Sequence, residues 1–367
     1  MLKTHNRSRR GVDLETAIVL CEGNFGNYVG KTANGLVRYS ERFEILGIID
    51  SSKAGRMAHE VVEGAQENIP IFGSLRDALS NLKEHPDNLI IGVATIGGKL
   101  PPEFRPVIIE AIKNEINVIA GLHEFLSMDD EFSVLAKEYR VELLDVRKEP
   151  PLEELHRFAN LCESLPTIRI PVLGTDSSMG KRTTAIKLTR ALNEDGIKTV
   201  FVTTGQTGIL QGFKYGLAID SIQGDYIVGE LEKEIVKAYE NEKPKVIIIE
   251  GQGSISHPAY VCGTRAIITA SQPNAIILQH APKRDYRNFR KEELKLPMPD
   301  LKKEIQMLEI FSNAKVIALT INHENMGNGE IEETVKEYEE KFGIPCCDVF
   351  KHGCKKLVVA IKQNFLE

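Results

Sequence analysis

The chain has 367 residues, of which 42% are hydrophobic and 27% charged, with a formal net charge of −6 at pH 7. This length allows two domains with full cores, and the mild negative charge argues against a general nucleic-acid or membrane-surface binder. Its apolar runs fall well short of the ~20 residues that a membrane span requires. No long apolar segment follows the basic N-terminal residues, so we expect a cytoplasmic protein without a signal peptide. Its six cysteines, none in a CxxC pair, are expected to be reduced thiols.

Short apolar runs alternate with amphipathic stretches in the first half of the chain. We predict strands at 16–21, 45–49, 89–94, 118–120 and 142–146, and a helix at 102–114. Strands that alternate with helices are typical of a parallel sheet covered on both faces. The first half therefore predicts an α/β domain over residues 1–150.

Glycine-rich turns follow the predicted strands of this half, as at Gly23, Gly26 and Gly30. Asp50 ends the second strand, where a dinucleotide-binding fold holds a ribose hydroxyl. The GxGxxG spacing of that fold is absent. The pattern thus favours a Rossmann-like domain, but it does not favour NAD as its ligand.

The break between the halves is predicted at 151–166, where prolines punctuate the chain and a short helix is expected up to Leu161. The second half, 167–367, repeats the alternation of strands and helices. Its predicted helices are 181–193, 229–241 and 330–342, and its predicted strands are 170–173, 199–203, 246–249, 275–278, 316–320 and 346–350. We predict two doubly wound parallel-sheet domains, Rossmann-like followed by P-loop NTPase-like.

A glycine-rich run, Gly-Thr-Asp-Ser-Ser-Met-Gly-Lys-Arg-Thr, joins the predicted strand 170–173 to a helix. In a P-loop the backbone N–H groups and the helix N-terminus attract phosphate oxygens, and the lysine reaches the terminal phosphates. The position after a strand and before a helix supports this interpretation. We predict that a cofactor phosphate is bound by Gly174, Thr175, Asp176, Ser177, Ser178, Gly180, Lys181, Arg182, Thr183 and Thr184.

Two features depart from the common P-loop. Five residues separate Gly174 from Gly180 instead of four, and Arg182 stands where a magnesium-binding hydroxyl usually follows the lysine. The longer spacing resembles the loop of dethiobiotin synthetase. The hydroxyl arrives one position late, at Thr183, and we assign a magnesium ion, if one is used, to Thr183 and Glu250.

Glu250 ends the apolar run 246–249 and is followed by Gly-Gln-Gly, which also resembles dethiobiotin synthetase. A carboxylate at a strand end suits a metal or a proton transfer, although a capping role is an alternative. His257 and His280 follow further strands, where an imidazole can act as a base near neutral pH. A structural, hydrogen-bonded histidine is equally expected at both positions.

A second group of polar residues is predicted to bind the substrate. Gln206 and Thr207 follow the strand 199–203, at the same expected sheet edge as His280. The charged stretch 283–299, predicted to be a surface loop or lid, carries three arginines whose forks suit carboxylates. We assign the substrate to Gln206, Thr207, His280, Arg284 and Arg287, while Arg290 or another of the three arginines belongs to a solvated charge run.

Local motifs occur along nearly the whole chain, at 31–39, 97–102, 121–126, 144–147, 174–183, 204–208 and 250–258. They resemble those of a bacterial and archaeal family long described as a domain of unknown function, which includes a D-glutamate N-acetyltransferase. The resemblance implies acetyl transfer from acetyl-CoA to the amino group of an acidic amino acid. Glu250 or His257 would then accept the ammonium proton, and Lys181 or backbone N–H groups would stabilise the oxyanion.

Two other functions remain open from the sequence. An ATP-dependent carboxylate ligase or kinase of the dethiobiotin synthetase type would bind ATP or GTP with Mg²⁺ in the same loop. A non-catalytic nucleotide or metabolite sensor would bind without turnover. In each case we expect a small-molecule ligand, no nucleic-acid or membrane partner, and a homo-oligomer.

Overall fold

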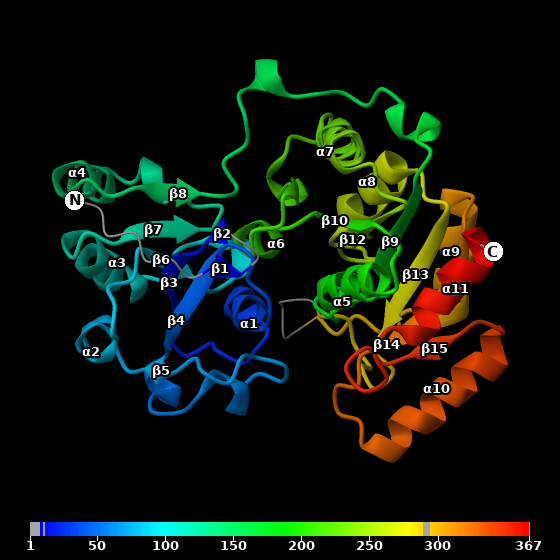
Figure 1. Cartoon of the computed structure of the whole chain (residues 1–367), viewed down its shortest axis with the longest axis horizontal. Coiled ribbons are helices and arrows are strands. Elements are labelled where there is room, and N and C mark those ends of the chain that lie inside the picture. Colours follow the sequence, from blue (N-terminus) through cyan, green and yellow to red (C-terminus); the bar gives the residue numbers. More distant parts are fainter. Residues whose placement is uncertain (1–7, 10–11, 289–293, 367) are drawn as a thin grey trace. The chain divides into compact units, whose positions relative to one another are not determined.

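The chain forms two compact units, each built on a parallel sheet (Figure 1). The computed structural model describes residues 8–9, 12–288 and 294–366. One unit comprises Met1–Glu149 and Gln206–Phe213, and the other comprises Pro150–Gly205 and Lys214–Glu367. The predicted fold class, two α/β domains with parallel sheets, is confirmed.

The N-terminal unit holds a six-stranded sheet in the order β5-β4-β3-β6-β7-β8, with every pair of neighbours parallel. A short antiparallel pair, β1 (Ser8–Arg9) and β2 (Val12–Asp13), precedes it. Short 3-10 turns at Ser51–Lys53, Ala58–Glu60, Ile96–Gly98 and Leu126–Met128 connect its elements. The strands are β3 (Glu15–Leu20), β4 (Phe43–Ile49), β5 (Ile71–Phe72), β6 (Asn88–Ile91), β7 (Asn117–Ala120) and β8 (Leu143–Asp145). The helices are α1 (Lys31–Arg38), α2 (Leu75–Asn81), α3 (Phe104–Lys113) and α4 (Asp130–Tyr139).

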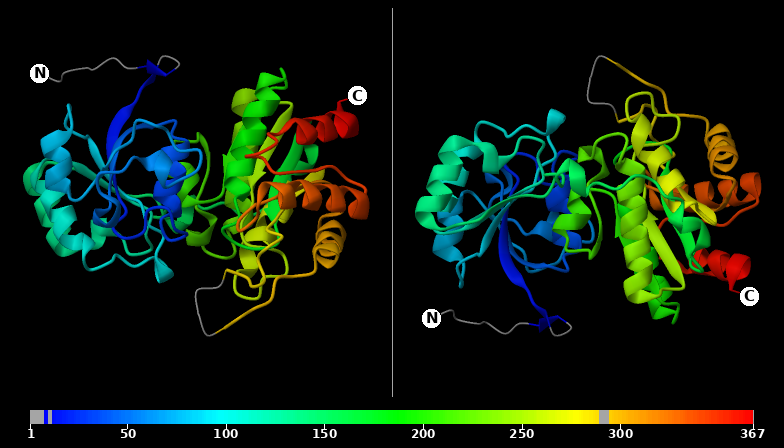
Figure 2. Two further views of the ribbon diagram at one scale, coloured as in Figure 1. Left: turned by 90° about the horizontal axis from the view of Figure 1, so that it is seen from below. Right: turned by 90° about the horizontal axis from the view of Figure 1, so that it is seen from above.

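The C-terminal unit holds a seven-stranded parallel sheet in the order β11-β10-β12-β9-β13-β14-β15. Helix α5 packs with α11 and helix α7 with α8, so that helices flank the sheet on both sides (Figure 2). The strands are β9 (Ile168–Gly174), β10 (Thr199–Thr203), β11 (Tyr215–Gly216), β12 (Val246–Glu250), β13 (Ala275–His280), β14 (Lys315–Ile321) and β15 (Cys346–Cys347). The helices are α5 (Lys181–Glu194), α7 (Ile227–Glu242), α8 (Val261–Ser271), α9 (Leu301–Ser312), α10 (Asn328–Phe342) and α11 (Lys355–Phe365).

The sequence of the central strands explains this layered packing. Four consecutive β-branched residues, Val246–Ile249, are each completely buried on β12. A strand buried on both faces is expected to be continuously apolar rather than alternating. β12 lies beside β9, and β9 lies beside β13, which places the ends of these three strands next to one another. The turns that follow them build the candidate site.

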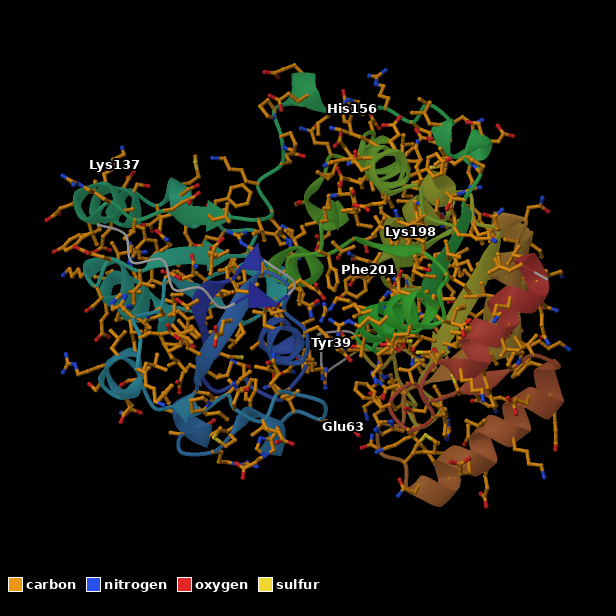
Figure 3. The ribbon with its side chains drawn as sticks, in the orientation of Figure 1. Tyr39, Glu63, Lys137, His156, Lys198 and Phe201 are labelled. Atoms are coloured by element: carbon orange, nitrogen blue, oxygen red, sulfur yellow. The ribbon has the colours of Figure 1, made fainter. Side chains whose placement is uncertain are left out.

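The segment 150–166 does not contain the helix expected up to Leu161. It has two 3-10 turns, at Leu152–Glu154 and Leu161–Ser164, and no regular structure between them. Two buried acids on α7 accept its backbone N–H groups: Glu230 accepts from His156 at 2.6 Å, and Glu232 accepts from Ala159 and Leu161 at 2.8 and 2.7 Å (His156 is labelled in Figure 3). N–H groups held by carboxylates are not available for helical bonds, so residues 155–160 form no helix.

Residues 206–213 follow β10 of the C-terminal unit in the sequence, but they pack in the N-terminal unit. They include α6 (Gln206–Leu210), and the side chain of Leu210 lies in the core of that unit. Gln211 Nε2 donates to the carbonyl oxygens of Gly35 and Tyr39, each at 2.8 Å (Tyr39 is labelled in Figure 3). The N-terminal unit is therefore completed by a piece of chain that follows β10.

Among the described residues, none of the helices combines the length and apolar character that crossing a membrane requires.

Candidate functional site

The loop between β9 and α5 has the backbone form of a phosphate cradle. Gly180 precedes α5 with φ of +99°, a left-handed conformation that favours glycine, and no side chain caps this helix end. A Cβ at Gly174 would lie 2.8 Å from Lys181 Cδ. The lysine side chain can therefore pass over the end of β9 only because residue 174 is a glycine. Lys181 Nζ donates to the carbonyl oxygen of Asp176 in the same loop. The loop thus combines a helix N-terminus with a lysine, which suits a phosphate.

Arg284 holds the middle of this loop in place. Its guanidinium donates to Asp176 Oδ2 at 2.8 Å and to the carbonyl oxygens of Ser177 and Ser178 at 2.8 and 3.3 Å. Two of its nitrogens also donate to the carboxylate of Glu324, at 2.6 and 2.8 Å. Asp176 is completely buried, and its Oδ2 also accepts from the backbone N–H of Asn288 at 2.6 Å. The sequence assigned Arg284 to the substrate. In the structure its guanidinium clamps the phosphate loop, and its assignment to the substrate stays a prediction.

His257 lies against the same carboxylate. Its Nδ1 accepts from the backbone N–H groups of Ala259 and Tyr260 at 3.1 and 3.2 Å, so the ring proton belongs on Nε2. Nε2 lies 3.5 Å from Asp176 Oδ1, and both side chains are fully buried. Burial holds the pKa of His257 below its usual value, with Asp176 acting in the opposite direction. A neutral imidazole with its proton on Nε2 has no vacant nitrogen for a substrate proton, so this arrangement does not favour His257 as the general base.

His280 ends β13 beneath the loop. Its Nδ1 lies 2.8 Å from Thr175 Oγ1, and both side chains are buried. Burial, reinforced by the charge of Arg284, lowers the pKa of His280 to about 4. The imidazole is therefore neutral at pH 7 and supports the loop instead of carrying charge to a substrate.

This buried histidine predicts a specific acid sensitivity. An unfolded His280 binds its proton below about pH 6.5, whereas the folded form resists protonation down to about pH 4, so stability is lost as the pH falls through that window. Between pH 7 and 5 we expect the wild type to lose about 2 kcal/mol more unfolding free energy than His280→Asn. Urea denaturation followed by circular dichroism at both pH values measures the difference. Equal losses in the two proteins would contradict the assignment.

Glu250 stands at the end of β12 with one carboxylate oxygen held and the other facing a cation. Its Oε2 accepts from Thr203 Oγ1 and from the backbone N–H of Thr204 at 3.1 Å. Its Oε1 lies 3.9 Å from Arg182 Nη1. The two threonines therefore fix Oε2, while Oε1 faces the guanidinium of Arg182.

Several threonine hydroxyl groups lie on and near the first turn of α5. Thr184 Oγ1 donates to Gln279 Oε1 at 2.6 Å, and Thr320 Oγ1 donates to the same oxygen at 2.6 Å. Thr183 is buried on the first turn of α5. Within the ranges that the structure describes, no cluster of three or more His, Cys, Asp or Glu side chains is placed to hold a metal. The magnesium assignment to Thr183 and Glu250 stays a prediction.

Arg287 is the second arginine at the loop, and its surroundings differ from those of Arg284. It donates to Ser254 Oγ at 2.8 Å, to Ser256 Oγ at 2.6 Å and to the carbonyl oxygen of Thr175 at 3.3 Å. These partners are neutral, so no carboxylate in these contacts offsets the guanidinium charge. Arg287 therefore suits an anion beside the phosphate loop. Arg290 lies outside the described residues.

Gln206 and Thr207 belong to the N-terminal unit. Gln206 Nε2 donates to Thr32 Oγ1 at 3.3 Å, and the hydroxyls of Thr32 and Thr207 lie 3.1 Å apart. A Cβ at Gly121 would overlap the side chain of Gln206, so that glycine makes room for it. The structure shows these two side chains in contact with Thr32 and Gly121 of the same unit. Their assignment to a substrate stays a prediction.

The glycine-rich turn after β3 is closed by its own contacts. A Cβ at Gly30 would lie 2.2 Å from the carbonyl oxygen of Asn24, so the glycine permits a close approach within the turn. Asp50 accepts from the backbone N–H groups of Phe25 and Ser52, each at 3.0 Å, and pairs with Lys53 at 3.2 Å. Burial favours a raised pKa, but hydrogen bonds from the Ser52 hydroxyl and the Phe25 N–H, together with Lys53, hold the pKa of Asp50 below its usual value. The carboxylate is used inside the turn, which does not favour a ribose site.

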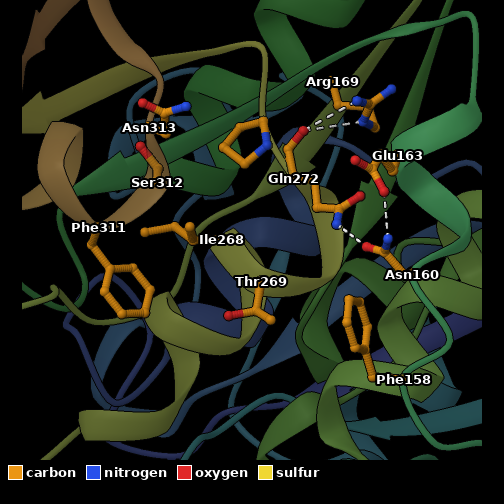
Figure 4. A pocket seen from close by; sticks show the side chains of 11 residues that line it. Phe158, Asn160, Glu163, Arg169, Ile268, Thr269, Gln272, Phe311, Ser312 and Asn313 are labelled. Carbon is orange, nitrogen blue, oxygen red and sulfur yellow. Dashed lines mark hydrogen bonds between the residues drawn. The ribbon is translucent and has the colours of Figure 1, made fainter.

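Two pockets in the C-terminal unit lie away from the phosphate loop. One, of about 540 Å³, is shown in Figure 4, with the rings of Phe158 and Phe311 on different sides. In it Asn160 donates to Glu163, and the Arg169 guanidinium donates to the carbonyl oxygens at the end of α8. The other, of about 650 Å³, lies among α9, α10 and α11. Neither pocket is lined by a residue that the sequence predicted for the site.

Sequence reasoning missed several residues that shape the loop. Ser254 and Ser256 hold Arg287, and Asn322 Nδ2 donates to the carbonyl oxygen of Met179 at 3.0 Å. The serines lie in the segment 250–258, which carries part of the family resemblance, and this position could have marked them as site residues. Asn322 directly follows β14, and its place at a strand end was a second one.

Comparisons with known proteins match both units of the chain to one family. A model described as a domain of unknown function, the DUF1611 C-terminal P-loop domain, matches residues 157–358, and the corresponding N-terminal Rossmann-like domain matches residues 51–149. A protein named D-glutamate N-acetyltransferase from Tritonibacter scottomollicae is 31% identical over 74% of this chain and 80% of its own length. One of the same name from a Pseudoalteromonas species is 30% identical over 73% and 79%.

A solved structure is similar over almost the full length. The crystal structure of a DUF1611 family protein from Anabaena variabilis superposes with a TM-score of 0.86 at 28% identity, covering 95% of this chain and 99% of that one.

Proposed function

Because the chain belongs to the DUF1611 family, we propose that it is an N-acetyltransferase that moves an acetyl group from acetyl-CoA to the amino group of an acidic amino acid such as D-glutamate. The observation that carries the proposal is the match to two relatives of that name over about four-fifths of their lengths. The phosphate loop of the C-terminal unit supports it, because coenzyme A carries phosphates.

The residues of the loop fit a cofactor phosphate. The first N–H groups of α5, the left-handed Gly180 and the ammonium of Lys181 would hold it, with Arg287 adding a second cation beside Thr175. Lys181 now donates to the loop carbonyl of Asp176, a contact that it exchanges for a phosphate oxygen when the ligand binds. The bound cofactor supplies an acetyl group activated as a thioester.

Glu250 is our choice for the base. An amino acid presents an ammonium group at neutral pH, and only the neutral amine attacks a thioester. Glu250 Oε1 would take the ammonium proton while Thr203 and Thr204 hold the other oxygen. The guanidinium of Arg182, which lies 3.9 Å from Glu250 Oε1, would pair with a carboxylate of the acceptor. Acidic amino acids are therefore the expected acceptors.

The test is an incubation of the protein with acetyl-CoA and a panel of D-glutamate, L-glutamate, D-aspartate and an uncharged D-amino acid. Free thiol and N-acetyl product should appear together, and D-glutamate should give the fastest rate. No thiol release with any member of the panel would rule out the proposal. A parallel incubation with ATP, Mg²⁺ and the same acids covers the ligase alternative, for which acid-dependent ADP release is the signature.

A further inference from the structure

Helix α9 carries a buried carboxylate, Glu304, that is linked to the phosphate loop through Ser256 and Arg287. No step of the proposed reaction uses it. Glu304 is completely buried, and its neighbours on the helix face either the core or solvent. Its Oε2 accepts from Ser256 Oγ, its Oε1 lies 3.4 Å from the backbone N–H of Ser256, and it also accepts from Ser254. Burial raises the pKa of Glu304, and its bonds to Ser256 act in the opposite direction. A completely buried acid that accepts hydrogen bonds from two serine hydroxyls requires an explanation beyond packing.

The two serines connect this acid to Arg287. A serine hydroxyl has one hydrogen and two lone pairs. Because Ser256 Oγ gives its hydrogen to Glu304, its lone pairs face Arg287 Nη2 at 2.6 Å. Ser254 Oγ accepts from Arg287 Nη1 at 2.8 Å in the same way, and Nη1 also reaches the Thr175 carbonyl oxygen at 3.3 Å. The acid therefore fixes which way both hydroxyls point.

We propose that Glu304 is a positioning residue for phosphate binding, which acts through Ser254 and Ser256 to hold Arg287 against the phosphate loop. The inference rests on the proposed function only in taking coenzyme A as the phosphate-bearing ligand. Without the carboxylate each hydroxyl is free to rotate and turn its hydrogen toward the guanidinium, where donor meets donor. Arg287 then loses its two hydroxyl acceptors and its place beside Thr175.

The experiment compares coenzyme A binding by calorimetry in the full chain and in variants of the relay. Glu304→Leu places an apolar side chain of similar size at this buried position of α9. It is expected to weaken the binding of coenzyme A about tenfold, which corresponds to the loss of one net hydrogen bond to a charged group. Glu304→Gln keeps one acceptor oxygen and should lose less. In a Ser254→Ala/Ser256→Ala background, Glu304→Leu should cause no further loss, since the serines transmit its effect.

Glu232→Leu on α7 is the matched control. Glu232 is equally buried and also accepts two hydrogen bonds, but it holds the backbone N–H groups of Ala159 and Leu161 instead of the loop. This variant should lose stability and keep the affinity for coenzyme A, which separates a positioning effect from general damage to the fold.

Each outcome decides the proposal. Affinity within twofold of wild type in Glu304→Leu, or a full additional loss in the serine-free background, overturns it. Failure of the wild type to bind coenzyme A, ADP and inorganic pyrophosphate overturns it as well. Binding of coenzyme A without acetyl transfer to any acceptor overturns the proposed function and leaves this relay testable by the same binding series.

Discussion

Under the proposed function we expect Glu250→Gln to lower kcat for acetyl transfer by about 10²–10⁴-fold, the usual loss when a general base is removed. Glutamine is almost isosteric with glutamate, and its amide oxygen still accepts from the backbone N–H of Thr204. The phosphate loop lies between β9 and α5, whereas Glu250 ends β12. The affinity for coenzyme A should therefore stay within a few-fold of wild type. Initial rates of thiol release at saturating acetyl-CoA and acceptor measure the effect.

A matched variant tests the alternative base. His257→Gln removes the imidazole but, on the geometry of its Nε2 and Asp176, should cost stability more than kcat. The assignment is contradicted if Glu250→Gln keeps a third or more of the wild-type kcat. It is equally contradicted if His257→Gln gives the larger loss of kcat in a folded protein.

Arg284→Met should be among the most destabilising substitutions in the C-terminal unit. It leaves the completely buried Asp176 without its guanidinium and removes the bidentate partner of Glu324. Loss of one partner from a buried ion pair costs about 3–5 kcal/mol, because the remaining charge stays desolvated. The chain has no tryptophan, so urea denaturation is followed by circular dichroism.

The control for this prediction removes the charge that becomes stranded. Asp176→Asn combined with Arg284→Met should recover a measurable part of the lost stability, since the amide carries no charge to desolvate. Arg287→Met, whose partners in the structure are neutral, should cost only about 1–2 kcal/mol. If Arg284→Met were no more destabilising than Arg287→Met, the clamp would have no energetic basis.

The fold was predictable because its signals are local. The run from Ile170 to Lys181 contains an apolar strand, a glycine turn and a helix start, and the structure places β9, the loop and α5 there. The family resemblance rested on such local segments and is confirmed by the comparisons. Strands β5 and β11 have two residues each, too few to show any periodicity, and the sequence did not predict them.

The roles of single polar residues were less predictable because their partners are distant in the chain. Arg284 and Arg287 look alike in the sequence, and only their contacts with Glu324 and with Ser256 distinguish a clamp from an anion-binding group. Glu304 stands among other charged residues of α9 and resembles a solvated acid. Its burial depends on which face of the helix meets the sheet. The irregular form of 155–160 likewise depends on Glu230 and Glu232 of α7.

The insertion of residues 206–213 into the N-terminal unit has a consequence for synthesis on the ribosome. Leu210 contributes to a core whose other members all lie before residue 150, and Gln211 caps the carbonyl groups at the end of α1. The N-terminal unit cannot close its core when residue 149 emerges. It must wait until β9, α5 and β10 have also been made. A gene cut at the apparent boundary would therefore yield an N-terminal fragment with an open apolar surface, and a nascent chain carries that surface until α6 arrives.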